Sequence, residues 1–129
     1  MPQIKIYGLK KSLENIKSEL STIIHNTVVK KLSFPQDKKY HRFIQFDESD
    51  MIFPDNKSEN YTIIEIIMME GRTVATKKNL IQSLFANIEK ELNIGKTDIE
   101  ICIIESPACN WGFGGMSGDE IELSYKIEV

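Results

Sequence analysis

The sequence predicts an α+β domain in which two tandem β-α-β units form a four-stranded mixed sheet, with two helices on one face and short extra strands. Two observations support this fold. The order strand, helix, strand occurs twice along the chain, and both helical segments repeat their apolar residues at a spacing of three and four. Two such units placed side by side give one sheet covered by both helices. At 129 residues, the chain is long enough for one such domain, spanning 1–129.

The first β-α-β unit covers residues 1–46. The segment 3–9, "QIKIYGL", alternates apolar and polar residues as a strand does. A helix follows over 12–32, with Ser12 as its expected N-cap, and "SFPQDK" ends it because proline cannot continue a helix. The segment 40–46, "YHRFIQF", is the second strand of this unit.

The second unit covers residues 61–105 and repeats the same order. The segment 61–70, "YTIIEIIMME", is apolar enough for a strand that is buried on both faces. After the turn "GRT", a helix is expected over 77–92, and "NIGKTD" ends it. The strand 99–106, "IEICIIES", then completes the unit as a parallel partner of the strand 61–70.

Two segments lie outside the repeat. The segment 47–60 is rich in Asp, Asn, Ser and Pro and is expected to form a connecting loop, with "MIF" as a short strand. Its carboxylates also suggest a calcium loop, but they lack the spacing of an EF-hand. The segment 106–129 is a glycine-rich loop followed by a C-terminal strand, because apolar residues alternate from Ile121 to Val129.

One face of the predicted sheet has no cover. Both helices lie on the other face, while the strands 61–70 and 99–106 carry apolar residues on both sides. The C-terminal strand adds an edge that can pair with a neighbour. We therefore expect a homo-oligomer.

The composition narrows the functional class. The net charge is -3 with scattered basic residues, which argues against nucleic acid as a partner, and no apolar run is long enough to span a membrane. Cys102 and Cys109 form no CxxC motif. Two reduced thiols in a cytoplasmic protein are the expected state, with a disulfide as the alternative.

Proline at position 2 is the first chemical signal. Methionine before proline is commonly removed, and Pro2 would then carry a secondary amine held rigid by its ring. Apolar surroundings disfavour the ammonium form, so that the neutral amine becomes a general base. The alternative is that Pro2 only begins a strand, where it removes no hydrogen-bond donor from the sheet.

Taken together, four features resemble the tautomerase superfamily: Pro2 before a strand, the two β-α-β units, "EGRT" before the second helix, and "NWGFGG" near the C-terminus. The resemblance spans nearly the whole chain. It is greatest to malonate semialdehyde decarboxylase-like and bacterial tautomerase-like members, and more distant to macrophage migration inhibitory factor and 4-oxalocrotonate tautomerase. It implies a homotrimer with active sites near subunit boundaries.

The resemblance also implies roles for two residues. Pro2 falls on the catalytic general base or acid, and Arg72 of "EGRT" falls on the arginine that binds a substrate carboxylate. The alternative for Arg72 is a structural role at the surface. Decarboxylase-like members carry a second arginine where this chain has Glu70, and an aspartate where it has Lys38, next to Asp37. Lys38 is retained as a candidate substrate-binding residue.

Further candidates come from the second strand and the glycine-rich loop. His41 and Arg42 are neighbours on a strand and point to opposite faces, so one of them can reach the pocket. His41 is expected to be neutral and hydrogen-bonded at an interface, whereas Arg42 is either an anion contact or part of a salt bridge. Trp111 and Phe113 either wall the pocket or belong to the core. Asn110 either donates to a substrate carbonyl or caps the loop.

The function implied is that of a tautomerase interconverting keto and enol forms of a small 2-oxo acid, with Pro2 moving the proton. No metal or organic cofactor is implied. One alternative is a decarboxylase-like lyase or dehalogenase-like hydratase. The other is a non-catalytic oligomeric protein that binds a ligand or partner.

Overall fold

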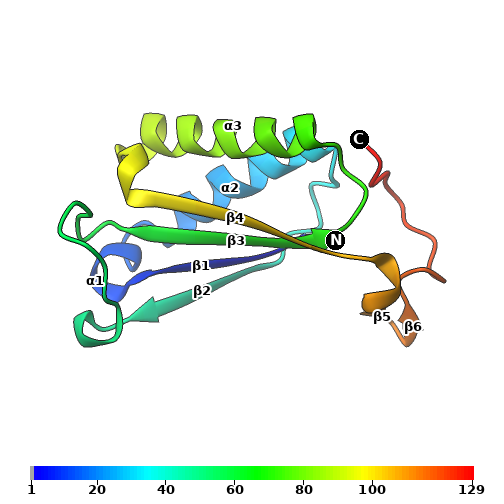
Figure 1. Ribbon diagram of the computed structural model, residues 1–129, viewed down its shortest axis with the longest axis horizontal. Coiled ribbons are helices and arrows are strands. Elements are labelled where there is room, and N and C mark those ends of the chain that lie inside the picture. Colours follow the sequence, from blue (N-terminus) through cyan, green and yellow to red (C-terminus); the bar gives the residue numbers. More distant parts are fainter. Residues whose placement is uncertain (1) are drawn as a thin grey trace.

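The computed structural model describes residues 2–129, so the expected removal of Met1 lies outside the described residues. Its main sheet has four strands in the order β2-β1-β3-β4 (Figure 1). These are β1 (Gln3–Leu9), β2 (His41–Phe46), β3 (Thr62–Met69) and β4 (Ile99–Ser106). β1 pairs with β2 in parallel and β3 with β4 in parallel, while β1 and β3 are antiparallel. The predicted mixed sheet made of two β-α-β units is confirmed.

Two long helices cover one face of the sheet. α2 (Lys17–Leu32) connects β1 to β2 and α3 (Val74–Leu92) connects β3 to β4, and both lie on the same side in Figure 1. Thr73 caps α3 by accepting a hydrogen bond from the Thr76 backbone N–H at 3.1 Å. Both helices end at a residue with left-handed backbone, Ser33 after α2 and Asn93 after α3.

The core lies between the helices and the sheet. Its fully buried side chains come from alternate positions of β1 and β3, from the inner faces of α2 and α3, and from the short α1: Ile4, Ile6, Leu13, Leu20, Ile24, Leu32, Ile64, Ile66, Met68, Leu80 and Leu84. The opposite face of the sheet carries no layer among the described residues. Ile104 of β4 is 40% exposed there, so the predicted uncovered face is present.

The first helical segment differs from the prediction. It is interrupted after α1 (Lys10–Leu13), and α2 begins only at Lys17. α1 packs closely on β1, because a Cβ at Gly8 would come within 2.9 Å of Leu13 Cδ1, so that glycine lets the buried Leu13 pack directly on the strand. The prediction of Ser12 as N-cap is therefore wrong. Ser12 lies inside α1 and donates to the Glu59 carbonyl oxygen at 2.7 Å.

Two predicted strands are absent from the described chain. The connecting loop forms a 3₁₀ turn (Glu48–Asp50) and "MIF" is not a strand. The C-terminal segment 119–129 forms no strand either, since it crosses one corner of the molecule and pairs with neither sheet edge. Its alternation persists in the burial, however, because from Ile121 onward its odd-numbered residues are half-buried and its even-numbered residues are exposed. The extra strands are instead β5 (Gly112–Phe113) and β6 (Met116–Ser117), which form a small hairpin.

Candidate active site

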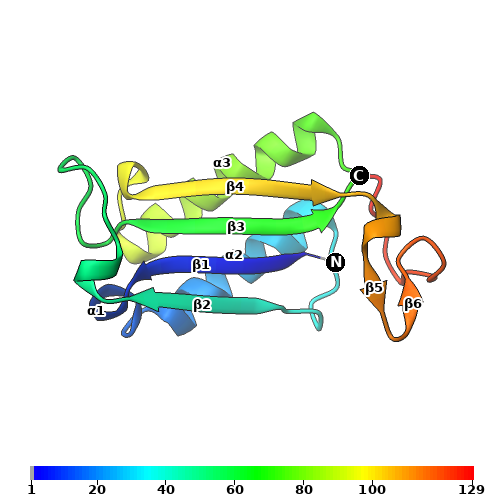
Figure 2. The same cartoon turned by 60° about the horizontal axis from the view of Figure 1, so that its bottom comes forward.

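The topology gathers the candidate residues at one end of the sheet. Because the two β-α-β units run in opposite directions, β1 and β2 begin at the end where β3 and β4 finish. Figure 2 shows the N-terminus, the hairpin β5–β6 and the C-terminus together at this end. The residues predicted from the sequence lie just before β1, at or before the start of β2, and just after β3 and β4: Pro2, Lys38, His41, Arg42, Arg72, Asn110, Trp111 and Phe113.

Pro2 is buried immediately before β1. Gln3 pairs with Ile67, so continuing the register by one residue places Pro2 beside Met68 near the end of β3. Met68 and Met69 are almost fully buried, at 0% and 1% exposure. Pro2 therefore lies beside apolar residues at the end of β3.

Arg72 is buried in the turn between β3 and α3, with only 5% of its surface exposed. Its Nη1 donates to the Met69 carbonyl oxygen at 3.3 Å, so the side chain folds back on the end of β3, the strand that Pro2 flanks. Its Nε and Nη2 are shielded from solvent and have no hydrogen-bond partner among the described residues. Buried polar groups are nearly always paired, so these two donors are suited to a ligand.

The charge around Arg72 favours an anion. Burial lowers the pKa of its guanidinium, while Tyr125 and Glu105 act in the opposite direction. Glu105 is already held by Lys77, whose Nζ lies 2.6 Å from the carboxylate. Among the described residues, no carboxylate is hydrogen-bonded to Arg72.

His41 faces the helices. Its Nδ1 lies 2.8 Å from Ser21 Oγ of α2, and its ring meets that of His25 edge-on at 5.9 Å. Burial lowers the His41 pKa to about 4, with Lys39 and His25 contributing in the same direction. The lowered pKa favours a neutral His41 near pH 7, and its Nδ1 is engaged inside the protein.

Arg42 and Lys38 are more accessible. Arg42 is exposed on the uncovered face of the sheet, and its Nη2 donates to Gln3 Oε1 at 2.9 Å. Lys38 is half-buried in the connection before β2. A surface hollow of about 360 Å³ lies beside this connection, lined by Gln3, Lys39, Tyr40, His41 and Arg42. Arg42 thus pairs in register with Lys5 and is hydrogen-bonded to Gln3, the residue after Pro2, but it lies on the open side of the sheet.

The glycine-rich loop packs on the ends of β3 and β4. Trp111 and Phe113 stack with ring centroids 5.6 Å apart, and Trp111 Nε1 donates to the Ser106 carbonyl oxygen at 3.3 Å. Asn110 is exposed and donates to Ser106 Oγ at 3.0 Å, which agrees with the loop-capping interpretation. A Cβ on Gly118 would lie 2.8 Å from Met69 Cε and 3.0 Å from Trp111 Cβ, so the loop lies tightly against the end of β3.

Sequence reasoning missed the part played by the C-terminal segment. Tyr125 is half-buried, but its hydroxyl is fully shielded and unpaired among the described residues. The Val129 carbonyl oxygen accepts hydrogen bonds from the Thr73 N–H at 3.1 Å and from Thr76 Oγ1 at 2.9 Å. The alternation of 121–129 places Tyr125 on the same side as the apolar residues, which was the available signal. The alternation does not indicate that the segment lies over the turn that carries Arg72.

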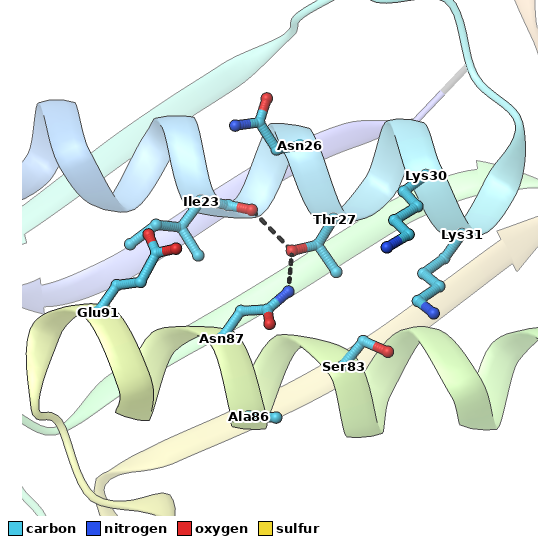
Figure 3. A pocket seen from close by; sticks show the side chains of 9 residues that line it. All are labelled: Ile23, Asn26, Thr27, Lys30, Lys31, Ser83, Ala86, Asn87 and Glu91. Atoms are coloured by element: carbon cyan, nitrogen blue, oxygen red, sulfur yellow. Dashed lines mark hydrogen bonds between the residues drawn. The ribbon is translucent and has the colours of Figure 1, made fainter.

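Another hollow, of about 280 Å³, lies between α2 and α3 (Figure 3). Thr27 and Asn87 close it from within, since Asn87 Nδ2 donates to Thr27 Oγ1 at 3.0 Å, which in turn donates to the Ile23 carbonyl oxygen at 2.8 Å. None of the candidate residues lines it, and its central polar groups are already paired. The site at the strand ends therefore remains the candidate.

Further structural features bear on metals, disulfides and membranes. Within residues 2–129, no group of three or more His, Cys, Asp or Glu side chains is arranged to hold a metal ion. Cys102 and Cys109 form no disulfide, in line with the expected free thiols, and both are exposed. No described helix has the length and apolarity needed to cross a membrane.

Comparison with known proteins agrees with this architecture. A family model described as "Tautomerase enzyme" matches residues 38–114. The probable tautomerase YusQ of Bacillus subtilis (strain 168) is 24% identical over 127 residues, which cover 95% of this chain and 100% of YusQ. A fused 4-OT described as a wild-type asymmetric trimer superposes with a TM-score of 0.80 at 19% identity, over 91% of this chain and 96% of that one.

A malonate semialdehyde decarboxylase structure is also similar in fold, with a TM-score of 0.77 at 17% identity, over 87% of this chain and 90% of that chain. These likenesses confirm the resemblance predicted from Pro2, "EGRT" and "NWGFGG". The family model spans more than half of the sequence. The two solved structures cover 91% and 87% of this chain. The chain belongs to the tautomerase enzyme family.

Proposed function

We propose that this protein is a cofactor-independent tautomerase that interconverts the keto and enol forms of a small 2-oxo acid. The observation that carries the proposal is the Arg72 guanidinium, which is buried with two unpaired donors at the end of the sheet where Pro2 begins β1. A fixed guanidinium matches a carboxylate bidentately, and burial strengthens the pair by excluding water.

In the proposed mechanism Arg72 binds the carboxylate of the substrate and Pro2 moves the proton. With Met1 removed, the Pro2 amine takes the proton from the enol hydroxyl and becomes an ammonium. It then delivers a proton to carbon C3, which gives the keto form and regenerates the neutral amine. The buried methionines beside Pro2 favour the neutral amine because burial disfavours the charged form. One residue thus serves as base and then as acid.

The isomerase proposal is favoured over the lyase and hydratase alternatives by two side chains. Glu70 is exposed, and it stands where decarboxylase-like members have an arginine. This position therefore supplies no second positive charge for an anionic substrate. Lys38 stands where those members have an aspartate, and the neighbouring Asp37 is exposed. Tautomerisation requires neither group, because a single amine performs both proton transfers.

We also propose that the protein acts as a homotrimer. The uncovered face of the sheet includes the exposed Ile104 and the half-buried Ile63 and Ile67, which are suited to association. The fused 4-OT relative described as a trimer supports the same arrangement.

The experiment that tests the function follows the ketonisation of phenylpyruvate enol by the protein with a free Pro2 amine. Catalysis should rise with pH as the amine deprotonates. Pro2→Ala keeps a terminal amine that is primary and less constrained, so its rate should fall without vanishing. An amine-directed label should attach to Pro2 and abolish activity. A wild-type rate no higher than that of buffer alone would favour the non-catalytic binding protein instead.

A further inference from the structure

The C-terminal segment 119–129 is fixed over the turn that carries Arg72. Its last residue, Val129, accepts hydrogen bonds from Thr73 and Thr76 at the start of α3. Earlier in the segment, Ile127 packs on the Gly71 backbone so closely that a Cβ there would lie 2.8 Å from Ile127 Cγ2. Figure 1 shows the C-terminus beside the first turn of α3. The segment is therefore part of the surroundings of Arg72.

Tyr125 of this segment turns its polar end inward. Its ring packs edge-on against Phe34, with centroids 4.9 Å apart. Tyrosines at a protein surface usually bury the ring and leave the hydroxyl in water. Here the ring is partly accessible while the hydroxyl is shielded and has no partner. Such a burial is unfavourable unless something pairs with the group.

Most of the unpaired buried groups belong to Arg72 and Tyr125. Within residues 2–129, four buried side-chain polar atoms have no hydrogen-bond partner, and three of them are Arg72 Nε, Arg72 Nη2 and the Tyr125 hydroxyl. Tyr125 lies two residues before Ile127, which packs on Gly71 beside Arg72. Burial raises the pKa of Tyr125, and the Arg72 charge lowers it by less, so the net direction is upward. The hydroxyl therefore remains protonated near pH 7 and can donate.

The chemistry of these groups defines the ligand. The guanidinium nitrogens only donate, and the protonated phenol has a hydrogen to donate. The nearby acceptor Glu105 is occupied by Lys77. A carboxylate has two oxygens and about four lone-pair positions and no donor of its own, so it can satisfy all three groups at once.

We infer that Tyr125 donates a hydrogen bond to the same substrate carboxylate that Arg72 binds, so that the C-terminal segment completes the anion site. This inference rests on the proposed function. It assigns Tyr125 a role in binding and none in proton transfer. Because Arg72 is only 5% exposed, binding of the carboxylate requires a movement of the residues around it.

The test compares Tyr125→Phe with wild type on phenylpyruvate and on its methyl ester. The substitution keeps the contact with Phe34 and removes only the hydroxyl. With phenylpyruvate we expect KM to rise about 10-fold or more, the effect of a hydrogen bond to a charged group, with kcat unchanged. With the ester the two proteins should have the same KM. Without ligand, the melting temperature of Tyr125→Phe should equal or exceed that of wild type.

Tyr61→Phe is the matched control. Tyr61 lies at the opposite end of the sheet, before β3, and its hydroxyl donates to Glu100. Removing that hydroxyl should leave KM for phenylpyruvate at the wild-type value.

The outcomes separate the two proposals. If wild type converts phenylpyruvate and Arg72→Met loses affinity while Tyr125→Phe retains it, the role of Tyr125 is overturned and the proposed function stands. A raised KM that comes with a lower melting temperature would make the hydroxyl structural, which also overturns the inference. If wild type neither binds nor converts phenylpyruvate, the proposed function fails, and the inference fails with it.

Discussion

Replacing Arg72 by methionine should move stability and function in opposite directions. Methionine is unbranched and of similar length, so it can fill most of the space of the arginine stem without a charge. Arg72 has one hydrogen bond to the protein, from Nη1 to the Met69 carbonyl oxygen, and two shielded nitrogens with none. Removing an incompletely paired buried charge in favour of an apolar side chain often stabilises a protein, here by about 1–3 kcal/mol.

The functional effect should be a loss. A desolvated arginine–carboxylate pair contributes about 2 kcal/mol or more when one partner is removed. Since each 1.4 kcal/mol corresponds to a factor of about ten, KM for phenylpyruvate should rise roughly 30-fold in Arg72→Met. Arg72→Lys should recover part of this loss, because the charge remains while the planar fork is gone.

Urea unfolding and steady-state kinetics on the same preparations measure both effects. Urea unfolding should give Arg72→Met a midpoint equal to or above that of wild type, while kinetics give the higher KM. If Arg72→Met is destabilised by more than about 1 kcal/mol and its KM is unchanged, Arg72 holds the turn together and does not bind substrate.

Two other predictions concern His41 and assembly. The folded-state pKa of His41 is lowered from 6.5 to about 4, so the unfolded chain binds more protons between these values and stability should fall as the pH drops from 6.5 to 4. The loss is at most about 3.5 kcal/mol at about 1.4 kcal/mol per pH unit. His41→Asn should make it smaller in urea unfolding at pH 4.5 and 7, and an equal loss in both proteins would assign it to other groups. Light scattering should give a mass of roughly three chains for wild type and a lower mass for Ile104→Lys, which places a charge on the uncovered face; a wild-type monomer at micromolar concentration would contradict the trimer.

The sheet and its two helices could be predicted because their signals are local. The strands 3–9 and 99–106 have the predicted bounds, since alternation and turn residues act within a few positions. The separation of the first helical segment into α1 and α2 could not be read in this way, because no break signal stands after Leu13 and the close contact of Leu13 with Gly8 is a contact between elements. Ser12 was a plausible cap by residue type, but its hydroxyl bonds to the distant Glu59 instead.

Part of the candidate site could also be predicted, because some of its residues are marked by local sequence signals. Pro2 and Arg72 are marked by position and motif, and the topology brings both to the end of β3. Tyr125 is marked by neither. Alternation correctly indicated which side of 121–129 turns inward, but a strand also requires a partner, and the segment has none among the described residues. Its place over Arg72 follows from long-range contacts of Val129 and Ile127 that no local pattern contains.

The most direct test of the catalytic role of Pro2 compares two forms of the same protein, one with Met1 retained and one with Met1 removed, each verified by intact mass. In the form that retains Met1, the Pro2 nitrogen is part of an amide and has no lone pair available to take a proton. The form with a free Pro2 amine should accelerate ketonisation of phenylpyruvate enol, and the other should be nearly inactive while melting at the same temperature. Equal activity in the two forms would contradict the proposed mechanism.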